Sequence, residues 1–240
     1  MIELHLGNCL DLLPNLPNNS IDLVLADLPY GTTPATWDKC IDISKLWLEY
    51  NRIGKSNCAY LLFTAQPFTS LVITSDIENF KYCWYWEKEK GTGFLNSMHQ
   101  PLRVIEEICV FYKKRPTYNP QMVLLDKPYK HKLPHLKSEL TNNVDSFKSE
   151  KYTYASYTHA HPKNLLKFAR DKRRIHSTQK PVELLEYLIK TYTNQGDLVL
   201  DNTMGSGSTG VACKNLKRDF IGMEIEEEMF KKAKERIDKA

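Results

Sequence analysis

The sequence predicts an α/β fold with a mostly parallel sheet that carries helices on both of its faces. Apolar runs such as Ile21–Ala26 and Cys58–Thr64 have the length and composition of strands buried on both sides. Between them, Ile43–Ile53 has apolar residues at helical spacing. Strands that alternate with helices are typical of parallel sheets. A chain of 240 residues, 42% of them apolar, is long enough for one large domain or for one domain with an insertion.

The first half of the chain is expected to begin with a strand at Ile2–Leu6 and a short apolar helix or turn around Leu10–Leu16, which Pro14 and Pro17 interrupt. After the buried strand at Ile21–Ala26, proline and glycine force a turn. The remaining elements of this half follow a helical or a strand-like apolar pattern. They are helices at Ile43–Ile53 and Phe68–Ile77 and strands at Cys58–Thr64, Tyr82–Trp86 and Ile105–Tyr112.

Regular elements are expected again near the C-terminus. Proline is favourable at the start of a helix, so Pro181–Tyr192 is predicted to be helical. A strand at Leu198–Leu200 leads into a glycine-rich turn, a helix from Thr209 to Leu216 and a strand at Phe220–Glu224. A charged helix follows that last strand.

Charge is distributed unevenly along the chain. The net charge is only +4, from 33 basic and 29 acidic residues. Between Lys113 and Ile175, however, 15 Lys and Arg stand against 5 Asp and Glu, a net charge of +10, so the remainder carries −6. Prolines interrupt this basic segment repeatedly. We therefore expect a main domain over residues 1–112 and 175–240, and an irregular basic insert over residues 113–174 that binds a polyanion.

Composition and motifs exclude several classes of protein. No apolar run approaches the ~18–20 residues of a membrane helix, and the first residues lack the basic and apolar regions of a signal peptide. The six cysteines are scattered without a C-x-x-C pair, which favours buried, reduced thiols in a cytoplasmic protein. His159 and His161 have no further ligand cluster near them, so no metal site is expected.

A glycine-rich turn follows the predicted strand at Leu198–Leu200. Gly205, Gly207 and Gly210 match the G-x-G-x-x-G fingerprint, in which glycine lets the backbone approach a ligand closely. Glu224 lies 19 residues after Gly205 at the end of a strand, where an acid can accept hydrogen bonds from ribose hydroxyls. The turn therefore indicates a cofactor that contains adenosine.

The position of this turn argues against a nicotinamide dinucleotide. The fingerprint normally opens its domain, whereas here only one further strand and helix follow it. Asp201, at the tip of the preceding strand, would face a pyrophosphate unfavourably but can meet a positively charged group. A sulfonium compound with a free ammonium group fits better, so the expected cofactor is S-adenosyl-L-methionine.

A second motif, Asp27-Leu28-Pro29-Tyr30, ends the buried strand at Ile21–Ala26, at the edge where open α/β sheets bind ligands. An exocyclic amine of a base is a poor nucleophile because its lone pair is delocalised into the ring. The Asp27 carboxylate and the Leu28 carbonyl can each accept one N–H bond, which favours a tetrahedral nitrogen with a free lone pair. Pro29 stiffens the turn, and Tyr30 offers a flat face for a base removed from its stack.

These motifs resemble those of the β-class amino-group DNA methyltransferases. Asp27–Tyr30 is similar to their (D/N/S)-P-P-(Y/F/W) motif, Asp201–Gly207 to their D-P-F-x-G-S-G motif and His176–Pro181 to their H-x-T-x-K-P segment. The catalytic motif comes first, an order that is circularly permuted relative to the other classes. The resemblance covers residues 2–112 and 175–232 and implies a Rossmann-like S-adenosylmethionine methyltransferase fold.

The resemblance also implies roles for the residues that match the family motifs. In the catalytic motif, Asp27 and the Leu28 carbonyl would hold the target amine, Pro29 would stiffen the turn, and Tyr30 would stack on the flipped base. The cofactor would be bound by Asn8, Asp27, Thr178, Lys180, Asp201, Thr203, Gly205, Ser206, Gly207 and Glu224. The basic insert falls where the family places target recognition, and phosphate contacts are expected from Lys113, Lys114, Arg115, Lys172, Arg173 and Arg174. The chain departs from the family pattern at Leu28, Asn202 and Thr203, which replace Pro, Pro and Phe.

The resulting prediction is a site-specific DNA methyltransferase that acts on the exocyclic amine of a flipped base. Asp27 favours adenine N6 over cytosine N4, since serine is more usual at this position in the cytosine enzymes. Methylation of RNA or of protein glutamine and a nicotinamide-dependent oxidation are the alternatives, although an oxidoreductase would leave the Asp27 motif and the basic insert unexplained. The expected partners are double-stranded DNA, a second copy of the chain and a restriction endonuclease, with no membrane.

Overall fold

The computed structural model describes residues 1–31, 40–133, 145–149, 152–172, 175–176 and 178–240. The chain forms two compact units, one of Met1–Asn119 with Asn164–Ala240 and one of Pro120–Lys163. In the described residues, the larger unit is built on an eight-stranded sheet and the smaller unit on a three-stranded sheet.

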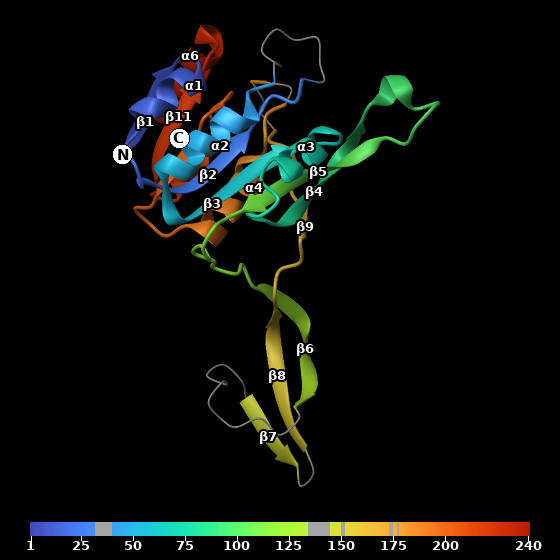
Figure 1. Cartoon of the computed structure of the whole chain (residues 1–240). Coiled ribbons are helices and arrows are strands. Elements are labelled where there is room, and N and C mark those ends of the chain that lie inside the picture. Colours follow the sequence, from blue (N-terminus) through green and yellow to red (C-terminus); the bar gives the residue numbers. More distant parts are fainter. Residues whose placement is uncertain (32–39, 134–144, 150–151, 173–174, 177) are drawn as a thin grey trace. The chain divides into compact units, whose positions relative to one another are not determined.

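The eight-stranded sheet is mostly parallel, as the sequence predicts (Figure 1). Its first five strands in spatial order run parallel to one another, the sixth is antiparallel to both of its neighbours, and the last is parallel to the seventh. In that order the strands are β1 (Ile2–Leu6), β11 (Asp219–Glu224), β10 (Leu198–Asp201), β2 (Ile21–Asp27), β3 (Gly54–Thr64), β5 (Arg103–Phe111), β4 (Phe80–Thr92) and β9 (Leu165–Lys167).

Helices cover both faces of this sheet, which confirms the predicted fold class. Side chains alternate between the faces of a strand, so Leu23 and Leu25 pack on one side while Val24 and Ala26 pack on the other. The helices that share a core with Val24 are α1 (Cys9–Leu12), α2 (Ile43–Ile53) and α3 (Phe68–Ser75), whereas α4 (Val182–Tyr192), α5 (Ser208–Asn215) and α6 (Glu227–Asp238) share one with Leu23. Short 3-10 turns lie at η1 (Leu13–Asn15) and η2 (Phe94–Asn96).

Strand direction decides which residues meet at the edge of the sheet. β2, β10 and β11 are parallel, so their last residues, Asp27, Asp201 and Glu224, lie at the same edge. β5 runs the opposite way, so its beginning lies at this edge and its end lies at the other. This edge is the place where open α/β sheets bind ligands.

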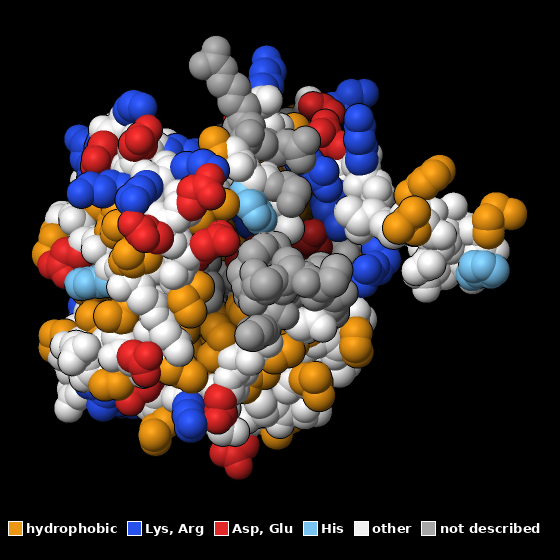
Figure 2. All heavy atoms as spheres, turned by 90° about the horizontal axis from the view of Figure 1, so that it is seen from above, with side chains coloured by type: hydrophobic (Ala, Val, Ile, Leu, Met, Phe, Trp, Pro, Cys, Tyr) orange, Lys and Arg blue, Asp and Glu red, His pale blue; other side chains and the backbone are white. Residues whose placement is uncertain are grey.

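β4 and β5 are longer than predicted and continue beyond the sheet as a hairpin that projects from the larger unit (Figures 1 and 2). Gly93 turns the chain at a positive φ of 91° before η2. The tip exposes Phe94, Leu95 and Met98. β9 is a further element that the sequence patterns did not predict, because three residues are too few to show a period.

The smaller unit corrects the expectation of an irregular insert. It contains an antiparallel sheet in the order β6 (Val123–Leu133), β8 (Tyr152–Ala160) and β7 (Asp145–Ser149). Pro128 lies inside β6, where the pairing with β8 shifts register between Leu124 and Tyr129. Such a bulge accommodates a residue that cannot donate a ladder hydrogen bond. The compact unit is also shorter than residues 113–174, because residues 113–119 and 164–174 belong to the larger unit.

Candidate active site

A cavity of 620 Å³ opens at the edge where β2, β10 and β11 end. Its volume lies within the ~300–1,000 Å³ range that is usual for small-molecule sites. The structure brings most of the predicted site residues together in its lining. They are Asn8, Asp27, Leu28, Pro29, Tyr30, Thr178, Lys180, Asp201, Thr203, Gly205, Ser206 and Glu224.

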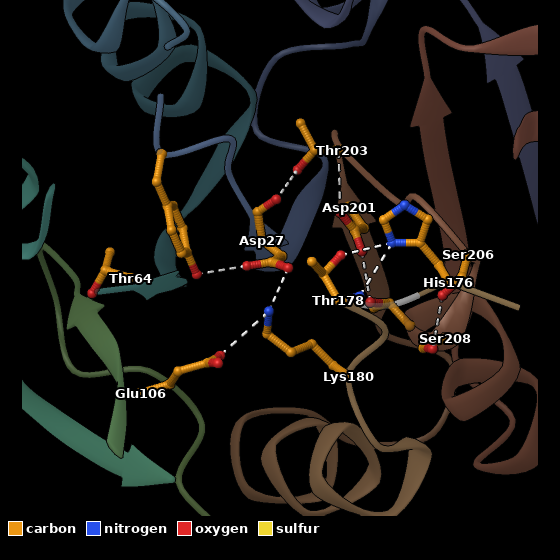
Figure 3. Close-up of polar contacts among 12 residues, drawn as sticks. Asp27, Thr64, Glu106, His176, Thr178, Lys180, Asp201, Thr203, Ser206 and Ser208 are labelled. Carbon is orange, nitrogen blue, oxygen red and sulfur yellow. Dashed lines mark hydrogen bonds and ion pairs between the residues drawn. The ribbon is translucent and has the colours of Figure 1, made fainter. Parts of the chain in front are cut away.

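Asp27 is the centre of a group of polar contacts (Figure 3). Its Oδ1 accepts a hydrogen bond from the Tyr30 hydroxyl at 2.8 Å, and its Oδ2 accepts one from Lys180 Nζ at 2.5 Å. The Thr203 hydroxyl donates to the main-chain oxygen of Asp27 at 3.1 Å. Burial raises the pKa of Asp27, and the charge of Lys180 opposes that effect. The motif residue is therefore fixed on three sides, including by the glycine-rich turn.

Tyr30 both bonds to Asp27 and forms a wall of the cavity. Its ring stacks on Phe68 with 5.3 Å between the ring centroids and 30° between the planes. Burial and the neighbouring Asp27 charge raise the pKa of Tyr30 well above its usual value, so its hydroxyl stays a hydrogen-bond donor. The half-buried ring thus has one face supported by Phe68 and still contributes to the cavity lining.

Asp201 is a buried carboxylate, only 3% exposed. It accepts hydrogen bonds from the Thr209 hydroxyl at 2.6 Å and from the Thr203 N–H at 3.1 Å. Burial raises its pKa to about 7 in spite of these bonds. Among the described residues no ion pair reaches Asp201, so the cavity has an uncompensated buried acid that suits a cationic ligand group.

Glu224 and the two glycines of the turn have different environments. The Gly205 N–H donates to Glu224 Oε2 at 2.9 Å, and Gly205 has a positive φ of 48°. Gly207, at φ 72°, lies outside the cavity lining: a Cβ there would approach Ile237 Cδ1 to 3.0 Å and Ala233 Cβ to 3.1 Å. Gly207 therefore permits close packing of the turn against α6, whereas Gly205 faces the ligand space.

The other predicted cofactor residues make local contacts. Asn8 Oδ1 accepts from the Leu10 N–H at 3.0 Å and so caps α1. Thr178 Oγ1 is 2.8 Å from His176 Nδ1, and both residues line the cavity. Ser206 is buried, and its carbonyl oxygen accepts from Arg236 at 3.0 Å. These contacts orient the loops that surround the cavity.

The predicted phosphate-contact residues that the structure describes lie toward two different edges of the sheet. Lys113, Lys114 and Arg115 are exposed just after β5 ends, at the edge opposite Asp27. Lys172 is exposed two residues beyond Arg170, which lines the cavity. Arg173 and Arg174 lie outside the described residues.

Glu106 and Lys88 belong to the site but were missed by the sequence patterns. Lys180 was expected to approach the cofactor, and the structure places its ammonium between Asp27 and Glu106. Lys88 donates to the other oxygen of Glu106 at 3.0 Å. Trp86 is 2% exposed and lines the cavity, so it belongs both to the core and to the wall of the site.

Three further observations restrict what the described part of the chain can do. In it, no group of three or more His, Cys, Asp or Glu is placed to hold a metal ion. No helix in the same ranges has the length and apolar character needed to cross a membrane. Five of the cysteines are buried, Cys40 is exposed, and none forms a disulfide.

Comparisons with known proteins agree with this geometry. A family model described as DNA methylase, of the N6 and N4 type, matches residues 21–235. The type II methyltransferase M.HpaI of Haemophilus parainfluenzae is 30% identical over 97% of this chain and 73% of its own length. The DNA adenine methyltransferase YhdJ of Escherichia coli K12 is 26% identical over 98% of this chain and 82% of its own. The crystal structure of the M1.HpyAVI–SAM complex has a TM-score of 0.64 and 26% identity, and the match covers 98% of this chain and all of that one.

Proposed function

The chain belongs to the DNA methylase family whose members modify exocyclic amines, and on that premise we propose that it methylates adenine N6 in double-stranded DNA with S-adenosyl-L-methionine as donor. One observation carries the proposal: Asp27, Asp201 and Glu224 line a single cavity. The Thr203 hydroxyl, bonded to the Asp27 carbonyl, joins the amine-binding motif to the cofactor turn.

The residues present fit this cofactor. Asp201 is buried without an ion-pair partner among the described residues, so it would bind the ammonium group of the methionine half. Glu224 lies at the end of β11 and would accept bonds from the ribose hydroxyls, with Gly205 close enough for its backbone to approach the ligand. When bound, the cofactor supplies an electrophilic methyl group on a positively charged sulfur.

Asp27 and Leu28 would prepare the amine for attack. The carboxylate accepts one N–H bond and the Leu28 carbonyl accepts the other, which directs the nitrogen lone pair toward the methyl group. The gain in rate comes from positioning and hydrogen bonding, without a covalent enzyme intermediate. Tyr30, supported from behind by Phe68, would stack on the flipped base.

Adenine is the proposed target for two reasons. Asp27 occupies the first position of the motif, where the cytosine enzymes more often have serine, and YhdJ is a DNA adenine methyltransferase. Single-molecule sequencing of DNA from cells that express the protein would report the modified base and its sequence motif together. N6-methyladenine at one motif is the expected result. Detection of N4-methylcytosine would identify cytosine as the target in place of adenine. Detection of unmodified DNA only would contradict the proposed DNA methylation.

The domain assignment and the partners are part of the same proposal. The larger unit, Met1–Asn119 with Asn164–Ala240, would carry catalysis, and the smaller unit, Pro120–Lys163, would recognise the target sequence. Resemblance to the type II methyltransferase M.HpaI supports a restriction endonuclease of the same specificity as a companion. A homodimer is proposed because the chain is short and has one recognition segment, and sedimentation with and without DNA would test it.

Cofactor affinity is expected to rise with pH through about 7, where burial places the pKa of Asp201. Below that pH the carboxyl is protonated and attracts an ammonium group less. Asp201→Asn should weaken S-adenosylhomocysteine binding at pH 7.5 by on the order of 10-fold and make the affinity nearly independent of pH between 5.5 and 7.5.

Calorimetric titrations at several pH values would measure this dependence. Asp197→Asn is the matched control, since Asp197 lies at the other end of β10, away from the cavity lining. A pH dependence in Asp201→Asn equal to that of the wild type would show that another group controls cofactor binding.

A further inference from the structure

Four charged side chains, one buried and three partly buried, form a chain of contacts beside the cavity. Lys180 Nζ lies 2.5 Å from Asp27 Oδ2 and 3.4 Å from Glu106 Oε2. Lys88 Nζ lies 3.0 Å from Glu106 Oε1 and 3.3 Å from the Thr92 hydroxyl. Exposed side-chain fractions are 28% for Asp27, 17% for Glu106, 10% for Lys180 and 5% for Lys88. Charges buried to this degree interact more strongly than surface ion pairs.

The sheet topology brings these four residues together from distant parts of the sequence. Asp27 ends β2, and Glu106 stands near the beginning of the antiparallel strand β5. Lys88 lies near the end of β4, just beyond the Trp86–Glu106 pair of that ladder. Lys180 precedes α4 and lies over the Phe63 ring at 5.1 Å. Figure 3 shows its ammonium group between the side chains of Asp27 and Glu106. The Lys180 ammonium group is therefore shared between Asp27 and Glu106, and Glu106 is itself paired with Lys88.

We propose that Glu106 is a positioning residue for methyl transfer: it shares Lys180 with Asp27 and keeps the charge of this cluster balanced. The proposal rests on the proposed function, because it assigns Asp27 to the target amine. Glu106 would make no direct contact with the target amine. It acts through Lys180, whose ammonium would otherwise pair with Asp27 alone and compete with the amine for the carboxylate.

The charge balance matters because of how the reaction moves charge. The amine lone pair forms the new N–C bond, the S–C bond breaks with its electron pair going to sulfur, and the positive charge passes from sulfur to nitrogen. The methylated nitrogen then loses a proton to solvent. Two carboxylates and two ammonium groups beside it sum to zero, whereas Glu106→Gln would leave a net charge of +1 that opposes the charge arriving on the nitrogen.

The same variant should change the acid side of the pH–rate profile. The charged groups around Asp27 are Lys180, Glu106 and Asp201, with Lys88 behind Glu106 and the Tyr30 hydroxyl on the opposite oxygen. Burial raises the pKa of Asp27, Lys180 lowers it and Glu106 raises it. Removing the Glu106 charge thus lowers the pKa of Asp27 and moves the acid limb to lower pH, which simple loss of packing would not do.

The test is single-turnover transfer of a radioactive methyl group to duplex DNA containing the recognition sequence, between pH 5 and 8.5. Glu106→Gln should lower the plateau rate by about 10-fold or more and move the acid limb to lower pH. Its affinity for S-adenosylhomocysteine should stay within about threefold, since Glu106 acts through Lys180. Glu107→Gln is the matched control: this neighbouring acid bonds Thr69 at 3.3 Å on the other face of β5 and should leave rate and limb unchanged.

A Glu106→Gln protein with wild-type rate and pH profile would overturn the proposal. So would an equal loss of rate in Glu107→Gln, or a loss of rate without movement of the acid limb. If Glu106→Gln does not fold, the double variant Glu106→Gln with Lys88→Gln removes a buried pair instead of leaving one charge unpaired, and the same shift of the limb is required of it. Absence of transfer by the wild-type protein would refute the proposed function instead.

Discussion

Asp27→Ala is expected to abolish methyl transfer, with a loss of at least about 10³-fold, while affinity for S-adenosylhomocysteine stays within about threefold. The carboxylate is the group that would accept an N–H bond of the target amine, and the cavity offers no equivalent at that position. Cofactor contacts with Asp201 and Glu224 are separate from it. The variant should also fold, because Lys180 keeps Glu106 as an ion-pair partner at 3.4 Å.

Asp27→Asn separates charge from shape at the same position. The amide keeps the volume of the carboxylate and one acceptor oxygen, but it should also lose most of the activity because its NH₂ group repels the amine N–H. Tritiated-methyl transfer and calorimetry would measure rate and cofactor affinity on the same preparations. Asp11→Asn, an exposed acid on α1, is the control for loss of one negative charge. Full activity in Asp27→Ala would refute the catalytic assignment.

The sequence predicts the main part of the site because three of its acids stand at the ends of buried parallel strands. Asp27, Asp201 and Glu224 each follow a short apolar run, and parallel strands bring such ends to one edge without further information. The fold class follows from the same runs. The motif position of Thr203 predicts that it belongs to the site. The hydrogen bond from its hydroxyl to the Asp27 carbonyl oxygen is visible only in the structure.

Glu106 and Lys88 could not be found in this way. These two residues reach the site because β5 runs antiparallel to β3. The direction of a strand cannot be predicted from the local pattern of its residues. In the sequence, Lys88 stands in a run of alternating Glu and Lys, and Glu106 stands beside Glu107, so both look like solvent-facing residues of an edge strand. Strand alternation could have placed Glu106 and Glu107 on opposite faces, but it could not have said which face meets Asp27.

Strand direction also separates the two basic clusters that were predicted to contact phosphates. β5 pairs Glu107 with Thr64 at the cavity edge and Phe111 with Tyr60 farther along, so the chain leaves β5 at the opposite edge. Lys113, Lys114 and Arg115 follow that exit. Lys172, Arg173 and Arg174 lie in the sequence between Arg170 and His176, which both line the cavity. DNA whose flipped base enters the cavity should therefore depend on the second cluster.

Replacing Lys172, Arg173 and Arg174 together with glutamine is expected to weaken duplex binding by on the order of 10- to 100-fold and to reduce the slope of log K against log salt by up to about 2.7. Each lost phosphate contact no longer releases a counterion, which is why the slope changes along with the affinity. Fluorescence anisotropy over a series of salt concentrations would measure both quantities, and S-adenosylhomocysteine binding should be unaffected.

The triple variant Lys113→Gln, Lys114→Gln and Arg115→Gln removes the same number of positive charges from the opposite edge. It therefore distinguishes direct phosphate contacts from the long-range electrostatic attraction between the whole protein and DNA. Long-range attraction between exposed charges is screened within about 8–10 Å at physiological salt. The control should therefore bind DNA within about threefold of wild type and keep its salt slope. Equal losses in the two triple variants would mean that the duplex also follows the side of the larger unit toward the end of β5, and that binding is not confined to the cavity edge.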